Sequence, residues 1–218
     1  MGVLSFLGAA RRKTETAPTP AVPAYTPKPT VDAALERIEA RFGARVQTAS
    51  ARIREAFQWH RTGRKADAFT AFHAMLADPQ LVSDAQARFA LEGEIHARLR
   101  VCYEREGCFA QALVETAMTY AVRAKAVAAE GNEAALQQLR DPEFFDRYFR
   151  PVLERARLSH ANVRFRAVLD EHLKTLPMVD MSALKESLER FRQNPPPPPK
   201  RVVDRVAGRL HITELHGA

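Results

Sequence analysis

Residues 35–57 read LERIEARFGARVQTASARIREAF, and this stretch decides the fold class of the chain. Its apolar residues recur at steps of three or four positions, at Leu35, Ile38, Phe42, Val46, Ala49, Ile53 and Phe57. This spacing is close to the helical period of about 3.6 residues, so it predicts an apolar stripe along one helix face. Gly43 lies within the stripe and costs a helix about 1 kcal/mol relative to alanine, which makes it a candidate break.

Residues that end helices divide the rest of the chain. They are Gly63, the pair Asp78-Pro79, Gly107, the pair Gly131-Asn132, the pair Asp141-Pro142, and Pro177. We expect one helix between each two of these signals, with Ser83 capping the helix that ends at Gly107. We also expect Pro151 to interrupt the aromatic-rich helix after Pro142. No segment alternates apolar and polar residues for long enough to predict a strand, so the sequence predicts an all-α body of antiparallel helical hairpins.

Proline-rich segments separate this body from both ends of the chain. Residues 14–30 contain five prolines and predict an extended linker, and Pro195–Pro199 predict a stiff spacer. An apolar and basic segment, residues 1–13, precedes the linker, and a basic amphipathic tail, residues 200–218, follows the spacer. The helical body is therefore expected over residues 31–194.

The two ends carry most of the net charge. The chain has a formal charge of +7, of which +3 lies in the first 30 residues and +2 lies after residue 194. A body with nearly equal numbers of basic and acidic residues is a poor match to a dedicated nucleic-acid-binding domain. Basic ends suit an anionic surface or an acidic partner. Residues 1–13 can contact an anionic membrane surface through three cations and the apolar residues Val3, Leu4, Phe6 and Leu7. The alternative is that this segment packs on its own domain or on nothing.

Two stretches of the predicted body share a spacing of large, glycine and small residues. The first is Trp59-x3-Gly63-x4-Ala68-x3-Phe72; the second is Tyr103-x3-Gly107-x-Phe109-x2-Ala112, with Leu99 four residues before the tyrosine. The glycines permit tight turns and the alanines permit close helix approach. We expect the large residues around the turns to be buried, namely Trp59, Phe72, Leu99, Tyr103 and Phe109.

This spacing resembles the tetratricopeptide repeat over about residues 51–125, which is under half of the chain. The resemblance implies stacked helical hairpins and protein–protein scaffolding through a concave groove, without identifying any peptide-binding side chain. The two glycines lie farther apart than the standard repeat length of about 34 residues allows. A generic array of helical hairpins stays open as the alternative.

The sequence contains no recognisable motif of the residue types that commonly carry catalysis or bind metals. The sequence contains no HExxH, no closely spaced cysteine pair of a zinc site, no GxSxG and no glycine-rich phosphate loop. Glu92 and His96 are expected to form a surface ion pair, and Cys102 and Cys108 are expected to pack between helices. We therefore expect a protein that is not an enzyme and that uses no cofactor or metal.

One region of the body combines arginines with aromatic residues. Over residues 141–166 the candidate anion-binding residues are Arg147, Arg150, Arg157 and Arg164, and the last three are spaced by seven. Interleaved arginines and aromatics can bind nucleic acid through phosphate contacts and stacking. The alternative is that the aromatics form core and the arginines form a solvated rim.

The tail is the second candidate binding segment. If it became helical, Val203, Val206 and Leu210 would form an apolar stripe beside Arg201, Arg205 and Arg209. Such spacing is typical of a helix that binds in a partner's groove. Folding of these residues back onto the body is the alternative outcome.

These features together predict a non-enzymatic helical-repeat adaptor that binds another protein. The alternative function is association with nucleic acid through residues 141–166 and the basic tail. We expect a cytoplasmic location, with peripheral contact to an anionic membrane left open. The partner's identity and the oligomeric state stay open as well.

Overall fold

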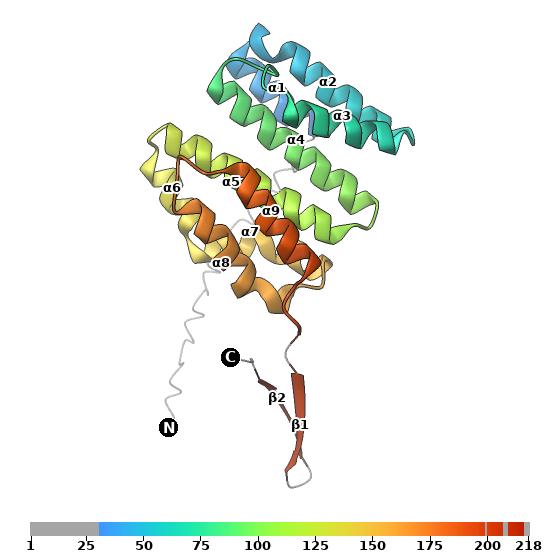
Figure 1. Ribbon diagram of the computed structural model, residues 1–218, viewed down its shortest axis with the longest axis vertical. Helices are drawn as coiled ribbons and strands as arrows, with labels where there is room; N and C mark the ends of the chain where they lie inside the picture. Colours follow the sequence, from blue (N-terminus) through green and yellow to red (C-terminus); the bar gives the residue numbers. More distant parts are fainter. Residues whose placement is uncertain (1–30, 199, 207–208, 216–218) are drawn as a thin grey trace, which may run out of the picture.

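The structure, a computed structural model, describes residues 31–198, 200–206 and 209–215, and its helical part is all-α (Figure 1). The α-helices of the described residues are α1 (Val31–Phe42), α2 (Ala44–Arg61), α3 (Lys65–Ala77), α4 (Ala85–Arg105), α5 (Phe109–Ala129), α6 (Glu133–Arg140), α7 (Pro142–Arg155), α8 (Asn162–Leu173) and α9 (Met181–Gln193), with a short 3-10 helix η1 (Ser159–Ala161) before α8. Consecutive helices pack as neighbours along much of the chain, most extensively α4 with α5. The all-α prediction is confirmed for these residues.

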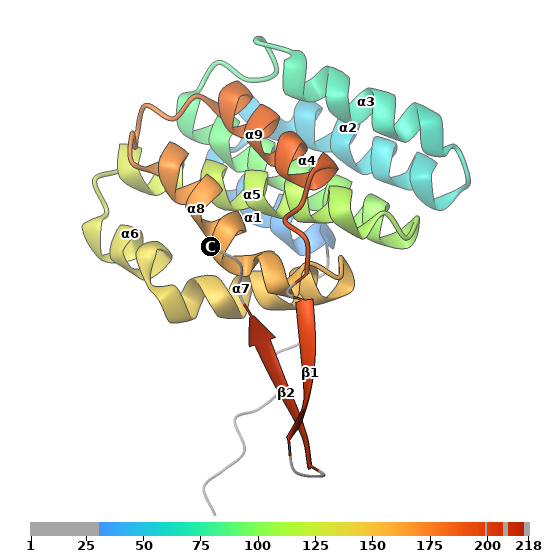
Figure 2. The ribbon, with the colours of Figure 1, turned by 60° about the horizontal axis from the view of Figure 1, so that its bottom comes forward.

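The C-terminal tail departs from the prediction. Strands β1 (Lys200–Val206) and β2 (Arg209–Leu215) pair antiparallel, with Val203 opposite Ile212. The expectation that no segment forms a strand is therefore wrong for the tail. The missed signal is the group of β-branched residues in the two segments, which favour strands: Val202, Val203, Val206, Ile212 and Thr213. Figure 2 shows the hairpin beyond the helical body. Residues 1–30, with the predicted N-terminal segment and linker, lie outside the described residues.

Two predicted helix ends, at Gly63 and Gly107, follow one hydrogen-bonding pattern. Gly63 and Gly107 have φ values of 92° and 73°, in the left-handed region that favours glycine. The N–H after each glycine donates to the carbonyl five residues earlier, Trp59 and Tyr103 respectively, at 2.8 Å in both turns. This is the Schellman motif, and it satisfies a carbonyl that the helix leaves open. Gly43, with φ 62°, also separates α1 from α2, which confirms the predicted break.

Two local predictions need correction. The cap of α4 is Asp84 rather than Ser83, because the Asp84 carboxylate accepts from the Ala87 N–H at 2.9 Å. Pro151 lies inside α7 and does not end it. Proline removes one helix hydrogen bond. Phe149 and Val152, on either side of Pro151, are buried, so packing on both sides of the proline offsets that loss.

Buried apolar residues form two clusters that divide the body. The first cluster lies among α1–α4 and includes the fully buried Leu35, Phe72 and Leu99. The second lies among α5–α9 and includes the fully buried Phe149 and Leu184. Figure 1 shows α1–α4 at one end of the molecule and α5–α9 at the other, with α4 and α5 side by side between them. The α4–α5 pair therefore joins two separate cores.

Three of the five large residues that we expected to be buried are not. Phe72 and Leu99 are fully buried as predicted, but Trp59, Tyr103 and Phe109 are half-buried. His60, the residue after Trp59, is buried instead. The Trp59 ring lies on the outer side of the turn, with the Arg64 guanidinium 4.5 Å from its centroid. Replacing Trp59 therefore removes less buried surface than the sequence suggested.

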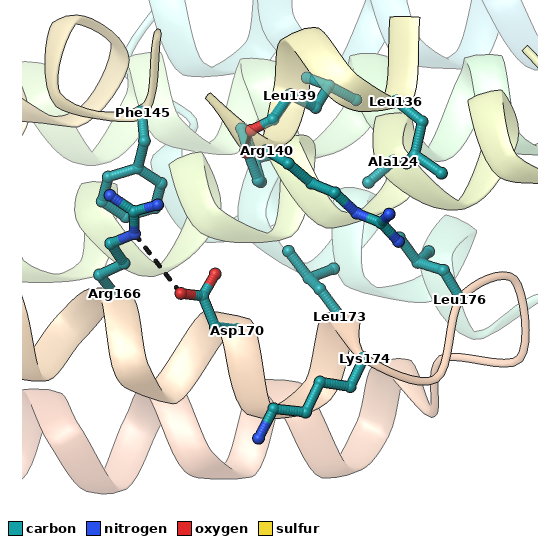
Figure 3. A pocket seen from close by; sticks show the side chains of 11 residues that line it. Ala124, Leu136, Leu139, Arg140, Phe145, Arg166, Asp170, Leu173, Lys174 and Leu176 are labelled. Atoms are coloured by element: carbon teal, nitrogen blue, oxygen red, sulfur yellow. Dashed lines mark hydrogen bonds and ion pairs between the residues drawn. The ribbon is translucent and has the colours of Figure 1, made fainter. Parts of the chain in front are cut away.

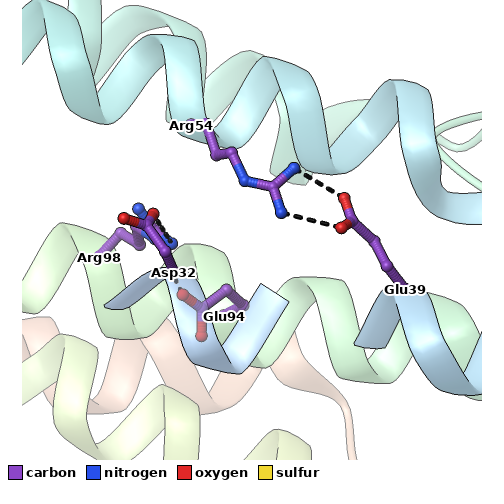
Figure 4. A network of polar contacts seen from close by, with 5 residues as sticks. All are labelled: Asp32, Glu39, Arg54, Glu94 and Arg98. Carbon is purple, nitrogen blue, oxygen red and sulfur yellow. Dashed lines mark hydrogen bonds and ion pairs between the residues drawn. The ribbon is translucent and has the colours of Figure 1, made fainter. Parts of the chain in front are cut away.

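Charged side chains are buried in the first half of the body (Figure 4). Arg98 is 1% exposed; its Nε donates to the Glu94 carboxylate at 2.8 Å, and its guanidinium lies 4.8 Å from the Phe57 ring centroid. Arg54 donates two hydrogen bonds to Glu39, at 2.7 and 2.9 Å, in the paired geometry typical of arginine and carboxylate. These contacts tie α1, α2 and α4 together.

The predicted Glu92–His96 surface pair does not form. His96 is buried, and its Nδ1 lies 2.6 Å from the Glu115 carboxylate of α5, whereas Glu92 accepts from Arg88 at 2.7 Å. His96 and Glu115 are 4% and 3% exposed, so this polar contact lies inside the α4–α5 interface. A hydrogen-bonded pair in an otherwise apolar interface fixes how the two helices align, because a shift would leave both groups buried without partners.

Candidate functional site

A pocket of about 450 Å³ opens between α5, α6, α7 and α8 (Figure 3). Its floor consists of the buried side chains of Tyr120 and Ala124 from α5, Leu139 from α6 and Phe145 from α7. The size falls within the range of about 300–1,000 Å³ that is typical of ligand pockets. The second core therefore leaves room for an apolar group.

The floor supplies no reactive group. The Tyr120 hydroxyl donates to the main-chain carbonyl of Leu139, and burial raises the pKa of Tyr120 to about 12. The hydroxyl is therefore neutral at physiological pH and already hydrogen-bonded. Its partner, Leu139, lies near the end of α6, so the bond also holds α6 against α5.

Two leucines and several charged residues form the walls and rim of the pocket. Leu173 ends α8 and Leu176 follows it, and both are half-buried. The Arg166 guanidinium lies 5.1 Å from the Phe145 ring centroid, and its Nε donates to Asp170 at 3.4 Å (Figure 3). Lys174, also on the rim, donates to the neighbouring Glu171 at 2.8 Å. Two of the three rim cations therefore already have carboxylate partners.

Arg140, the last residue of α6, is the third rim cation. It makes no hydrogen bond, ion pair or ring contact with any residue that the structure describes, and it is exposed. Figure 3 shows its side chain extended along the pocket, between the leucines of α6 and Leu176. An arginine placed this way can hold a carboxylate or another oxyanion whose apolar neighbour occupies the floor.

The structure separates the arginines that the sequence aligned. Arg147 and Arg150 are exposed on α7, Arg157 lies in the turn after α7 with φ 59°, and Arg164 is exposed on α8. They cannot form one stripe, because the turn at residue 157 changes the chain direction between the two helices. The seven-residue spacing of Arg150, Arg157 and Arg164 therefore does not place them on one helix face.

The aromatic residues of the same region are mostly core. Phe145, Phe149 and Phe165 are each at most 2% exposed and pack against one another. Buried rings cannot stack on nucleic-acid bases without unfolding. The alternative in which these aromatics are core and the arginines are a rim describes this region.

The predicted tail residues lie in the hairpin. Arg201, Val203, Arg205 and Val206 are in β1, and Arg209 and Leu210 are in β2. Arg205 pairs with Leu210 and Val206 with Arg209 in the strand register. The helical spacing on which the predicted stripe depended therefore does not describe the tail in this structure. A role for these residues in partner binding stays a prediction.

The described residues offer no metal-binding cluster. No group of three histidine, cysteine, aspartate or glutamate side chains in that part of the chain is placed to hold a metal ion. Burial raises the pKa of the Cys102 thiol to about 12, so this cysteine is not a thiolate at neutral pH. Cys108, which we expected between helices, is exposed at the start of α5.

Among the described residues, none of the helices combines the length and the apolar character that crossing a membrane requires.

Sequence reasoning missed the pocket, although its residues are ordinary members of helical stripes. Leu136 and Leu139 are the apolar positions of α6, and Leu173 continues the stripe of α8. Their spacing predicts that they face inward, but not that four helices leave a gap there. Arg140 gave one available signal, since it follows Leu139 directly and so lies at the edge of an apolar face.

The sequence matches no protein-family model, and searches of curated proteins and of solved structures find no significant match. The chemistry of the pocket therefore has to be judged from its own residues.

Proposed function

We propose that this protein is a non-enzymatic adaptor that binds another protein through the α5–α8 pocket. The partner segment would place a large apolar side chain on the floor and an aspartate or glutamate against Arg140. The observation that carries this proposal is the position of Arg140, a cation without a partner among the described residues, beside an apolar pocket. The charge of the rim also favours an acidic partner segment, because the residues that line the pocket include three cations and one carboxylate.

The tetratricopeptide-like arrangement is part of this proposal. Ala68 and Ala112, the small residues of the two repeated stretches, are both 0% exposed. Their burial supports close packing within the hairpins α2–α3 and α4–α5. The aromatic-x3-glycine part of the pattern carries less weight, because a Schellman motif usually places a glycine four residues after the residue whose carbonyl it caps.

Nucleic-acid binding through residues 141–166 is the alternative function, and the geometry supports it less. Its stacking residues are in the core and its arginines lie on separate elements. A salt titration separates the two functions. A complex that neutralises several phosphates weakens about 10³-fold or more between 50 and 200 mM salt, whereas an apolar anchor with one ion pair weakens far less.

A display library of random 12-residue peptides tests the proposal on the full chain. We expect the bound peptides to share a large apolar residue next to aspartate or glutamate. Arg140→Glu should abolish this enrichment, and Leu176→Asp should weaken it, since both residues line the pocket. The matched control is Arg147→Glu, which changes an exposed arginine of α7 outside the pocket. Absence of enrichment, or enrichment that survives Arg140→Glu, would contradict the proposal.

A further inference from the structure

A second groove lies on the other side of α8 from the pocket. It has a volume of about 540 Å³ and is formed by the first half of α8, the last turns of α9 and the start of the proline tract. Its lining includes Arg164 from α8 and Ser187, Arg190 and Asn194 from α9 and its C-terminal end. Because α8 and α9 pack against each other, the two arginines approach the groove from different helices.

The groove contains two positive charges and no carboxylate. Arg164 makes no hydrogen bond or ion pair with any described residue, and Arg190 donates only to the neutral Ser187 hydroxyl, at 3.2 Å. Of the carboxylates close by in the sequence, Glu189 accepts from Arg192 at 2.6 Å and Asp170 accepts from Arg166. Glu186, four residues before Arg190, is exposed and pairs with no described residue. The groove therefore holds two guanidinium groups without a counter-ion.

The groove is supported from behind and along one edge. Phe191, 7% exposed, and Val168 give it an apolar floor. Pro196 forms an edge and is held to the body, because His160 Nε2 donates to its carbonyl at 2.9 Å. His172 Nε2 lies 3.0 Å from the Ser187 oxygen, and this contact fixes the hydroxyl that orients Arg190.

We propose that this groove binds an organic phosphate monoester. Two guanidinium groups match the double charge of a phosphate monoester and offer paired N–H donors to its oxygens. The Asn194 amide and the Ser187 hydroxyl provide further polar contacts. The volume exceeds that of a phosphate ion, so the organic group lies on Phe191 and beside Pro196. This site is independent of the α5–α8 pocket and shares no lining residue with it.

An NMR titration of the full chain with phenyl phosphate, at constant ionic strength and pH 7.5, tests this site. We expect saturable amide shifts confined to residues 164–168 and 187–194, with a dissociation constant on the order of 1 mM. Inorganic phosphate and benzoate should each bind at least about fivefold more weakly, because one lacks the ring and the other lacks the second charge.

The variants decide whether the arginines carry the binding. Arg164→Gln and Arg190→Gln should each weaken phenyl phosphate binding about tenfold, the loss of a charged hydrogen bond. Arg150→Gln, an exposed arginine on α7 outside the groove, is the matched control and should change nothing. Shifts that do not saturate, or that survive Arg164→Gln and Arg190→Gln, would overturn the site. Equal affinity for benzoate would overturn the phosphate assignment, and equal affinity for inorganic phosphate would overturn the role of the organic group.

Discussion

The two halves of the body are stabilised in different ways. In α1–α4, buried charged groups accompany an aliphatic core, and Arg98 and Glu94 are both nearly inaccessible to solvent. In α5–α9, aromatic rings dominate, and Phe149 lies 4.5–5.2 Å from four other ring centroids. Buried charges require fixed partners, whereas ring contacts tolerate several geometries. The α5–α8 pocket lies in the half whose described residues contain no buried ion pair, and the first half leaves a pocket of about 570 Å³ as well, beside the buried Arg98.

A buried polar contact lies in the interface between the helices that join the halves. His96 of α4 and Glu115 of α5 are 2.6 Å apart and buried. This contact fixes the alignment of α4 against α5, and the alignment sets where the second core and its pocket begin.

The largest effect should come from removing a central ring. Phe149→Ala should lower the free energy of unfolding by about 4–5 kcal/mol, the upper part of the range for buried phenylalanine. Phe72 is equally buried but has no ring contact among the described residues, so Phe72→Ala should cost about 3–4 kcal/mol. Urea denaturation of both variants measures the difference. Equal losses would show that the ring contacts of the second core add nothing beyond burial.

The next effect concerns the buried charge pair of the first half. Arg98→Met should cost about 3 kcal/mol at pH 7.5, because the Glu94 carboxylate stays buried without its hydrogen-bond donor. Burial already raises the pKa of Glu94, against the lowering effect of Arg98, and the substitution should raise this pKa further. The folded state then holds a proton more tightly than the unfolded state, so stability falls as the pH rises above the unfolded value of about 4.5.

Two measurements test this account of Arg98. The stability deficit of Arg98→Met should shrink as the pH falls from 7.5 to about 4.5, because Glu94 of the folded variant takes up a proton and no longer holds a buried, unpartnered charge. The double variant Arg98→Met with Glu94→Leu should recover most of the loss at pH 7.5. A deficit that does not change with pH, or that the second substitution does not reduce, would mean that lost packing on Phe57 causes the effect.

The sequence predicted helices far better than it predicted which residues lie inside. Positions such as Gly43 and Gly107 act locally, through φ values and capping bonds, so their effect can be foreseen from neighbouring residues. Burial of Trp59 or His60 depends on which side of a turn meets another helix, and local spacing does not contain that information. Arg98 shows the same limit, since a charged residue on a helix is normally solvated.

The candidate site was harder to predict for a related reason. The pocket depends on how α6 and α8 are spaced around α5, and these helices are separated by many residues in the chain. Arg164 was identified as an anion-binding candidate from residues 141–166, but its groove is completed by α9 and Pro196. Residue type was therefore foreseeable there, whereas the partners that complete each site were not.

A smaller, pH-dependent effect should distinguish the halves further. His60 is buried in the first half, and this burial lowers its pKa below the usual 6.5. The Glu106 carboxylate, 3.3 Å away, raises the pKa of His60 in part. The cations Arg105 and Lys65 lower it further. The unfolded state therefore takes up the proton first, and stability is lost as the pH falls below 6.5. Urea denaturation at pH 7.5 and 5.5 should show a larger loss for the wild type than for His60→Gln. Parallel losses would assign the pH dependence to other groups.

The smallest effect should be a gain in stability, in the second half. Arg157 occupies the same position after α7 that Gly63 and Gly107 occupy after α2 and α4. The N–H of Leu158 donates to the Leu153 carbonyl at 2.8 Å, and Arg157 has φ 59°. A side chain at this φ costs energy that glycine avoids, so Arg157→Gly should stabilise the protein by about 0.5–1 kcal/mol. Thermal and urea unfolding measure the change.

The control for Arg157 is the reverse substitution in the first half. Gly107→Ala should destabilise by about 1 kcal/mol, since open space surrounds the position where a Cβ would lie and only the backbone conformation is strained. Opposite signs for the two substitutions would show that the left-handed turn limits stability equally in both halves. If Arg157→Gly destabilises instead, the arginine contributes a contact that outweighs its backbone strain, and the turn after α7 differs in kind from the turns after α2 and α4.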